Sequence, residues 1–483
     1  MDIRVIACVL GRLTLAVDAA LLAPFVMSLY YMETSRLAFA LTVIVCAVIG
    51  SALLAWSDGW SGDFSVREGI AITGLGWLLI MLLGTMPYVL GGYLGPLDGL
   101  FESISGFTGT GATVIDSLQS LPESILFWRS MTHWLGGLGI IVIFIAVIPQ
   151  MGHSAIYMYK AEISGANSER MLPRLKDMAM VLFKLYTGFT VVACVIFMAC
   201  GMDLLDALNH AFSTIATGGF STYDASARHF DSPAIEGWMT FFMLASGVNF
   251  ALYYKAWLRG PRVFLHNTEF KAYMGLLLAA AVCIAADLIA GMGYGPGQAI
   301  RYATFQVASI ATTGFVSADF DVWPSFSKFL LMLLMVSGGC AGSTAGGLKM
   351  TRVVLLVKIA KAAVWQKLHP HILAEVKLNG KIVDEGRLHQ VCLFFFVYIM
   401  FIVFWALLLT ADGISMFDAI GISVTTMGSV GPGFGIAGAT CAYSSLSDFS
   451  KAILCISMTL GRLEMFTVLV MLNPAFWRMK KSW

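Results

Sequence analysis

Charged side chains are scarce in this sequence. Only 12% of its 483 residues are Asp, Glu, Lys or Arg, whereas 58% are hydrophobic. An ordinary soluble domain carries about 25% charged residues. A water-soluble protein of this composition would lack the polar side chains that cover a surface, which excludes the soluble classes. The nine cysteines have no CxxC or zinc-like spacing, so we expect them to pack as small hydrophobic residues without a disulfide framework.

Enzyme and nucleotide-binding motifs are also missing. The chain contains no HExxH, no GxSxG and no GxxxxGK[ST], and no GxGxxG follows a predicted strand. We therefore expect neither an enzyme nor a cofactor in this chain, and no nucleic-acid partner. Any control by a nucleotide would have to come from another protein.

Long apolar runs predict an all-α integral membrane protein. About ten segments are long enough to cross the roughly 30 Å hydrocarbon core as helices. They are 5–31, 37–56, 68–92, 124–149, 179–200, 235–258, 270–292, an interrupted 325–360, 388–411 and 449–472. The first run lacks the A-x-A site of a cleaved signal and is predicted to stay as a transmembrane helix.

The distribution of basic residues predicts the topology. Most of the 30 lysines and arginines lie in 150–178, 255–271, 349–387 and 473–483. Because cytoplasmic loops carry an excess of Lys and Arg, both termini are predicted to be cytoplasmic. The smaller set expected outside is Arg36, Arg129, Arg228, Arg301, Lys328 and Lys451.

Four shorter segments between the later spans are copies of one another. They read DGLFESISGFTGTGATV, DALNHAFSTIATGGFST, RYATFQVASIATTGFVS and DAIGISVTTMGSVGPGF, starting at Asp98, Asp206, Arg301 and Asp418. In each copy a glycine stands at the same distance from the start, and these aligned glycines are Gly111, Gly219, Gly314 and Gly431. Such equal spacing indicates a repeated structural unit.

Each copy is predicted to be a half-helix that enters the membrane and ends in a glycine loop. About twelve helical residues span about 18 Å, which reaches only halfway across the bilayer. Non-helical backbone at that depth must be buried in protein or line a water-filled cavity. Four such loops entering from the same side would converge on one axis, where their carbonyl oxygens could replace an ion's hydration shell. The alternative interpretation is tight helix packing or outer turns, which four copies in phase disfavour.

A family resemblance lies in five motifs: SGFTGTGATV, FSTIATGGFST, ATTGF, GPG and, at 337–347, SGGCAGSTAGG. In these motifs the chain resembles the Trk/Ktr/HKT superfamily of potassium transporters, and most closely its bacterial TrkH/TrkG branch. The resemblance implies potassium uptake across the bacterial cytoplasmic (inner) membrane. It also implies a homodimer with one pore in each protomer and a cytosolic, nucleotide-binding regulatory subunit of the TrkA type. The basic segment 349–387 is a candidate docking surface for that subunit, or simply part of the topology signal.

The resemblance assigns a selectivity filter to the four glycine loops, with K⁺ as the only bound ion. The predicted filter residues are Thr110, Gly111, Thr217, Gly218, Gly219, Thr312, Thr313, Gly314, Ser429, Val430 and Gly431. Relatives with serine in place of the first glycine tend to admit sodium, so Gly111 favours potassium. The first copy departs from the others because Gly109 stands where they carry Thr217, Thr312 and Ser429.

A second glycine cluster interrupts the run at 325–360. Glycine is about 1 kcal/mol poorer than alanine in a helix, and the cluster contains Gly338, Gly339, Gly342, Gly346 and Gly347. The resemblance makes 337–347 an intramembrane loop that gates the pore, with Arg462 of the last span facing the pore below the filter. The alternatives are close helix packing for the glycines, and a structural ion pair or snorkelling for the arginine.

Carboxylates recur near the predicted outer mouth. Asp116, Asp224 and Asp319 each follow an aligned glycine by five residues, and Ile436 takes that place in the fourth copy. They predict either a cation-concentrating ring or ordinary turn residues. Asp98, Asp206 and Asp418 are predicted to cap the half-helices.

The predicted organisation is two N-terminal transmembrane helices (1–62) followed by four tandem repeats of span, pore helix, filter loop and span around one pore. The repeats are 63–152, 175–262, 268–365 and 385–483. The leading hypothesis is a gated, channel-like potassium pore. A proton- or sodium-coupled symporter is the first alternative, although repeats in such transporters are commonly inverted. A membrane-embedded enzyme that uses the outer carboxylates is the second.

Overall fold

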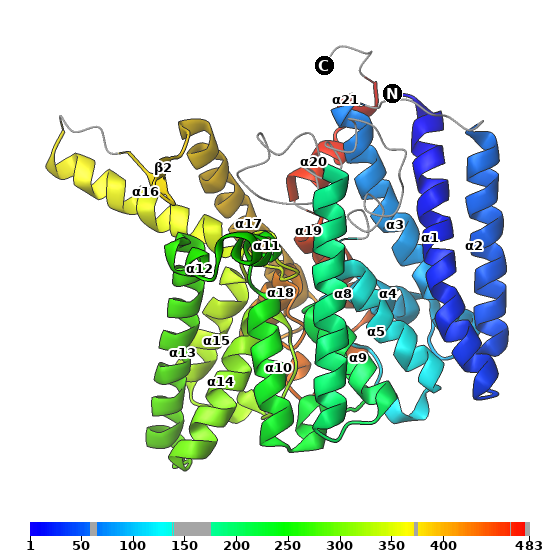
Figure 1. Ribbon diagram of the computed structural model, residues 1–483, viewed down its shortest axis with the longest axis horizontal. Helices are drawn as coiled ribbons and strands as arrows, with labels where there is room; N and C mark the ends of the chain where they lie inside the picture. Colours follow the sequence, from blue (N-terminus) through cyan, green and yellow to red (C-terminus); the bar gives the residue numbers. More distant parts are fainter. Residues whose placement is uncertain (58–64, 138, 140–174, 371–374, 464, 479–483) are drawn as a thin grey trace.

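The computed structural model describes residues 1–57, 65–137, 139, 175–370, 375–463 and 465–478. These residues are mostly α-helical, which confirms the predicted fold class (Figure 1). The later part of the predicted span 124–149, most of the basic segment 150–178, residues 58–64 and the C-terminal 479–483 lie outside the described residues.

The N-terminal helices pack beside the first span. α1 (Ile3–Tyr30), α2 (Arg36–Trp56) and α3 (Val66–Leu90) contact one another along their lengths. Ser65 and Glu68 form a capping box at the start of α3, and Glu68 also accepts a hydrogen bond from the Asp2 amide at 2.6 Å. The N-terminus is thus tied to the first turn of α3.

Four sets of helices repeat the order span, half-helix, span. The first set is α3, α4 (Pro96–Thr108) and α5 (Glu123–Gly137); the second is α8 (Leu175–Ala199), α9 (Leu204–Ile215), α10 (Pro233–Ser246) and α11 (Phe250–Arg259). The third is α13 (Thr268–Met292), α14 (Pro296–Thr312), α15 (Ser325–Ser337) and α16 (Met350–Leu368); the fourth is α17 (Glu385–Ala411), α18 (Met416–Gly428), α19 (Asp448–Arg462) and α20 (Met465–Leu472). The half-helices α4, α9, α14 and α18 coincide with the four sequence copies.

The connecting elements are short. They are η1 (Leu118–Ser120), η3 (Ser226–Phe230), α12 (Arg262–His266), η4 (Phe320–Val322), the hairpin of β1 (Lys377–Leu378) and β2 (Lys381–Ile382), η5 (Gly435–Ala437), η6 (Tyr443–Ser445) and α21 (Pro474–Arg478).

Two predicted spans are not continuous helices. The run 235–258 bends by 88° between α10 and α11, and the run 449–472 bends by 114° between α19 and α20. The third interruption, at 325–360, was predicted from its glycines. Six described helices are long and apolar enough to span a membrane, or up to eight if each bent pair counts as one. The protein is therefore a multi-pass membrane protein.

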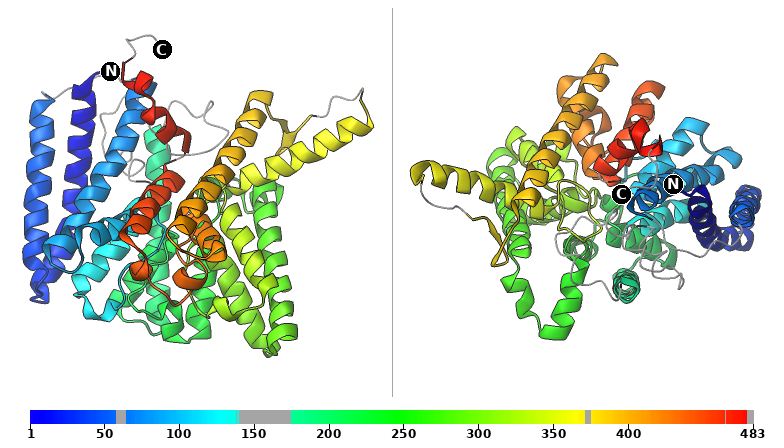
Figure 2. Two further views of the ribbon diagram at one scale, coloured as in Figure 1. Left: turned by 180° about the vertical axis from the view of Figure 1, so that it is seen from behind. Right: turned by 90° about the horizontal axis from the view of Figure 1, so that it is seen from above.

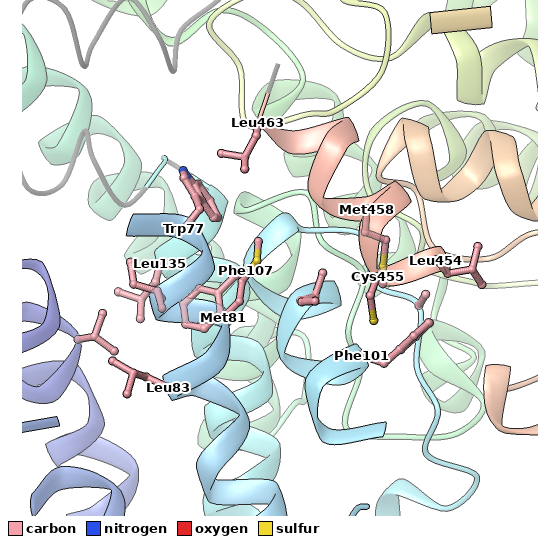
Figure 3. Packing of buried hydrophobic residues seen from close by; sticks show 14 of the residues in the cluster. Trp77, Met81, Leu83, Phe101, Phe107, Leu135, Leu454, Cys455, Met458 and Leu463 are labelled. Atoms are coloured by element: carbon pink, nitrogen blue, oxygen red, sulfur yellow. The ribbon is translucent and has the colours of Figure 1, made fainter. Parts of the chain in front are cut away.

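The four sets close into a ring. The second span of each set packs against the half-helix of the next: α5 on α9, α10 on α14, α15 on α18, and α19 on α4. Seen from above, the sets surround a common centre (Figure 2). At the contact that closes the ring, Cys455 of α19 lies beside Phe101 of α4, and Phe107 of α4 lies beside Met81 of α3 (Figure 3). The first and fourth sets therefore share one hydrophobic core.

Candidate ion pathway

The four aligned glycines lie in loops that follow directly on the half-helices. Gly111, Gly219, Gly314 and Gly431 have φ values of 80°, 81°, 101° and 98°, a left-handed region that disfavours any residue with a Cβ. All eleven predicted filter residues lie in these loops or at the adjoining helix ends. They are buried, apart from the half-buried Gly111 and Gly219.

The aligned glycines meet one another in a cycle. A Cβ on Gly111 would overlap the carbonyl oxygen of Gly218, and one on Gly219 would overlap that of Thr313. A Cβ on Gly314 would overlap the carbonyl oxygen of Val430, and one on Gly431 would overlap that of Thr110. Each glycine therefore contacts the residue before the aligned glycine of the next set, and the fourth contacts the first. The structure brings all four loops together in this order.

The carbonyl groups in this ring need a partner. Within the described part of the chain, the oxygens of Thr110, Gly218, Thr313 and Val430 accept no hydrogen bond. Buried backbone carbonyls are almost always paired, so four unpaired ones around one axis require explanation. A ring of carbonyl oxygens can coordinate a dehydrated cation. Since each preceding half-helix ends at its loop, the negative end of its dipole would favour the same charge.

The departure at Gly109 has a backbone explanation. Gly109, Thr217 and Ser429 have φ values of 68°, 56° and 54°, so glycine adopts this conformation with the least strain. The third loop differs because α14 continues through Thr312, and Thr313 has a φ of −121°. The four loops are thus equivalent at the aligned glycine but not two residues before it.

The glycine cluster at 337–347 forms a non-helical loop between α15 and α16, against the break between α10 and α11. The Cys340 amide donates to the Gly247 carbonyl at 2.8 Å, and the Phe250 amide donates to the Gly342 carbonyl at 3.0 Å. A Cβ on Gly346 would overlap the carbonyl oxygen of Gly428, the last residue of α18. These contacts bury the loop in protein next to the glycine ring, which explains both the helix break and the unpredicted bend after α10.

Thr344 joins this loop to the second filter loop. Its hydroxyl accepts a hydrogen bond from the Thr217 hydroxyl at 3.1 Å and lies 3.1 Å from the carbonyl oxygen of Ile215. The sequence analysis did not single out Thr344. The available sequence signal was a hydroxyl residue between the glycine pairs Gly338–Gly339 and Gly346–Gly347.

Arg462 lies at the end of α19 and holds the glycine loop from another side. Its guanidinium donates to the Thr344 carbonyl at 3.0 Å, to the Gly137 carbonyl at 2.9 Å and to the Gly136 carbonyl. It also lies over the ring of Trp77, 5.8 Å from the centroid. The arginine therefore connects the end of α5 to the predicted gate. Gly338, Gly339, Gly342, Gly346 and Gly347 all belong to the same loop.

Glu269 was not predicted to contribute. This buried residue of α13 accepts the amide of Ala341, inside the glycine loop, at 2.6 Å and the amide of Thr351, in the first turn of α16, at 3.1 Å. It links the loop to α16, the helix that forms the first part of the basic segment 349–387. A carboxylate directly before the predicted span 270–292 was the available sequence signal.

The three outer aspartates each have hydrogen-bonding partners. Asp116 accepts a hydrogen bond from Ser444, Asp224 accepts the Leu118 amide at 2.7 Å, and Asp319 accepts the Asp321 amide at 3.0 Å. Asp116 and Asp224 thus tie loops of neighbouring sets together, and Asp319 caps η4. Burial raises the pKa of the nearby Asp321 carboxyl. These bonds give the aspartates a structural role beside the predicted cation ring.

The prediction that Asp98, Asp206 and Asp418 cap the half-helices was wrong. The caps are Gly95, Asp203 and Ser415, so the three aspartates lie inside the first turns. Asp98 instead pairs with Lys451 of α19 at 2.8 Å. At the equivalent contact between the second and third sets the charges are exchanged: Arg301 of α14 pairs with Glu236 of α10 at 2.8 Å. Ion pairs between sets explain why the third copy begins with arginine.

Arg129 makes an interaction that the sequence analysis did not foresee. It was counted among the basic residues expected outside, and its side chain is 1% exposed and pairs with Glu102 of α4 at 2.7 Å. Glu102 escaped the sequence analysis. The sequence signal for Glu102 was a carboxylate within an otherwise apolar half-helix, since buried carboxylates are rare unless they are paired.

The comparisons with known proteins agree with this architecture. A family model described as the TrkH cation transport protein matches residues 35–285 and 289–478. The Trk system potassium uptake proteins TrkH of Halomonas elongata and of Escherichia coli K12 are each 36% identical to the chain over 99% of its length and 100% of theirs. The crystal structure of the potassium transporter TrkH from Vibrio parahaemolyticus superposes with a TM-score of 0.90 at 33% identity, covering 99% of this chain and 100% of that one. These relatives are named as transport proteins, in agreement with the expectation that the chain is not an enzyme. The chain belongs to the TrkH family of cation transport proteins.

Proposed function

We propose that this chain takes up potassium across the bacterial cytoplasmic membrane through a single pore. The observation that supports this most strongly is the closed cycle of four glycine loops, in which the carbonyl oxygens of Thr110, Gly218, Thr313 and Val430 accept no hydrogen bond from any described residue. Dehydrated monovalent cations are coordinated by carbonyl rings of this kind. The names of the relatives, which are potassium uptake proteins, support potassium as the substrate.

The same proposal assigns gating to the loop 337–347 and Arg462. The loop lies against the filter through the hydrogen bond between Thr344 and Thr217, and Arg462 bonds to the Thr344 carbonyl. A positive charge below the filter disfavours a cation there, so conduction would require Arg462 and the loop to move together.

Orientation and partners complete the proposal. The positive-inside distribution supports cytoplasmic termini. With that orientation, the proposal assigns Asp116, Asp224 and Asp319 to a partial cation ring at the outer mouth. Family resemblance supports a homodimer and a cytosolic nucleotide-binding subunit of the TrkA type. We infer that this subunit acts through the basic helix α16, because Glu269 connects that helix to the gate loop.

Flux from liposomes that contain the purified protein alone tests the proposal. We expect downhill potassium flux that is weaker in sodium and insensitive to a pH gradient. A Gly111→Ser variant would lose part of the preference for potassium, because its side chain meets the Gly218 carbonyl. Flux that appears only with a proton or sodium gradient would replace the channel-like pore by the symporter alternative.

A further inference from the structure

Glu102 and Arg129 form an ion pair that is completely buried behind the first two filter loops. The Arg129 Nε and a Glu102 carboxylate oxygen are 2.7 Å apart, and the side chains are 1% and 0% exposed. Burying two charges carries a large desolvation penalty, and a well-packed apolar pair is often equally stable. Stability alone therefore does not explain this pair.

The remaining hydrogen bonds of the pair go to the filter loops. Glu102 accepts the Val114 amide at 3.1 Å and the Thr113 hydroxyl at 3.0 Å. Arg129 donates to the Ser221 carbonyl at 3.1 Å and to the Thr113 hydroxyl at 3.3 Å. Thr113 and Ser221 stand two residues after Gly111 and Gly219. One ion pair thus bonds equivalent positions in two adjacent loops.

Aromatic packing fixes the second loop from the same helix. The Arg129 guanidinium lies 4.0 Å from the centroid of Phe220, the residue after Gly219, and the His133 ring stacks on Phe220 with centroids 4.0 Å apart. The His133 ring also occupies the space that a Cβ on Gly218 would need. α5 therefore holds the second loop on both sides of its aligned glycine.

The other two loops are held by neutral groups. The position of Glu102, nine residues before the aligned glycine, carries His210, Phe305 and Ile422 in the later copies. Arg129 is the seventh residue of its span, α5. The seventh residues of α10, α15 and α19 are the buried apolar Met239, Leu331 and Leu454. In the third loop, the Phe315 carbonyl accepts a hydrogen bond from the Ser309 hydroxyl at 2.5 Å. In the fourth loop, the Pro432 carbonyl accepts one from the Thr425 hydroxyl at 3.1 Å.

We propose that the buried Glu102–Arg129 pair is a positioning element that sets the relative placement of the first two filter loops and thereby contributes to discrimination between potassium and sodium. The inference rests on the proposed function, since it assumes that these loops form the filter. The planar guanidinium has donors in a fixed fork, so it can hold Thr113 and Ser221 at a defined separation. Because the pair is neutral, it does this without adding net charge beside the cation.

Two charge-removing variants and their combination separate positioning from electrostatics. Glu102→Gln leaves a net positive charge behind the filter, Arg129→Gln leaves a net negative one, and the double variant leaves none. If the pair acted through charge, the single variants would shift flux in opposite directions and the double variant would restore it. A positioning role predicts that all three lower the potassium-to-sodium flux ratio, by about tenfold, because each loses a charged hydrogen bond to a loop.

The experiment measures potassium and sodium flux from liposomes holding equal amounts of folded full-length protein. Glu236→Gln is the matched control, because Glu236 pairs with Arg301 between a span and a half-helix and, among the described residues, forms no hydrogen bond with a filter loop. We expect its flux ratio to stay at the parent value. Thr113→Val keeps the ion pair and removes the hydroxyl that both partners bond, and we expect a fall in the ratio of about threefold.

An unchanged ratio in both the double variant and Thr113→Val would overturn the inference. If a charge variant does not fold, Thr113→Val alone decides. A parent protein without preference for potassium would instead overturn the proposed function.

Discussion

The hydroxyl groups of Thr217 and Thr344 are 3.1 Å apart, so the predicted gate contacts the predicted filter directly. Thr217 directly follows Ala216, the C-cap of the half-helix α9, and has a positive φ of 56°. Thr344 lies in the glycine loop between α15 and α16. A movement of the glycine loop would therefore remove a partner from the filter itself.

Replacing Thr344 by valine should increase potassium flux. Valine keeps the shape of threonine but loses the hydrogen bonds with Thr217 and the Ile215 carbonyl. Because neutral hydrogen bonds contribute about 1 kcal/mol each, we expect a threefold to tenfold rise, roughly, in flux without the regulatory subunit. Ser343→Ala is the control, since in the described part of the chain the Ser343 hydroxyl donates only to the Cys340 carbonyl, within the same loop. Equal flux in Thr344→Val and the parent protein would show that this contact does not hold the gate.

Removing the charge of Arg462 should open the pore further. Arg462→Gln loses hydrogen bonds to the carbonyls of Thr344 and Gly137 and removes a positive charge from the proposed cation pathway. Hydrogen bonds to charged groups contribute about 1.5–3 kcal/mol, so flux should rise at least about tenfold. Arg462→Lys retains the charge and should give an intermediate value. Lower flux in folded Arg462→Gln protein would contradict a gating role.

Glu269 should stabilise the closed arrangement. Glu269→Leu leaves the buried amides of Ala341 and Thr351 without their acceptor, at a cost of about 1–3 kcal/mol for each group. We expect a lower thermal midpoint in detergent together with higher flux. Glu385→Gln, an exposed carboxylate in the first turn of α17, should change neither. A lower midpoint without a change in flux would restrict Glu269 to a structural role.

The third aligned glycine should not tolerate a methyl group. Gly314 has a φ of 101°, and a Cβ there would overlap the Val430 carbonyl. Gly314→Ala should reduce potassium flux by about tenfold or more, since strained backbone conformations cost about 1–3 kcal/mol. Gly297→Ala, in the first turn of the same half-helix and with open space around it, should conduct normally. Normal flux in Gly314→Ala would argue against a filter at this ring.

Acid should weaken the contact between α17 and α19. Hydrogen bonds from Ser447 and Ser450 hold the pKa of Asp412 below its usual range. A depressed pKa contributes stability above the unfolded value of about 3.9, and this contribution is lost as pH falls through the folded value. Thermal midpoints of the parent protein and Asp412→Asn should therefore differ at neutral pH and converge below about pH 4. A constant difference across that window would count against the ionised carboxylate as the cause.

The repeat could be read from the sequence because it depends on local chemistry. Four half-helices of similar length must each end in a loop, and only glycine tolerates the left-handed backbone at Gly111, Gly219, Gly314 and Gly431 without strain. The break at 337–347 was predictable for the same reason, since clustered glycines do not sustain a helix. Apolar length and the placement of basic residues predicted the membrane class.

The partners of buried charges could not be read from the sequence. Arg129 was counted only among the basic residues expected outside, and Asp98 was expected to cap a helix, because local sequence pattern does not show what lies across a helix interface. Their partners are Glu102 on the preceding half-helix and Lys451, far along the chain. The bend between α10 and α11 also depends on a distant segment, the glycine loop that bonds to Gly247.

The sequence by itself determined the helices, the repeat and the glycine loops, because backbone propensity and hydrophobic length are local. Only the tertiary structure decided which charges pair and which residues contact the predicted gate, because those contacts form when the ring closes.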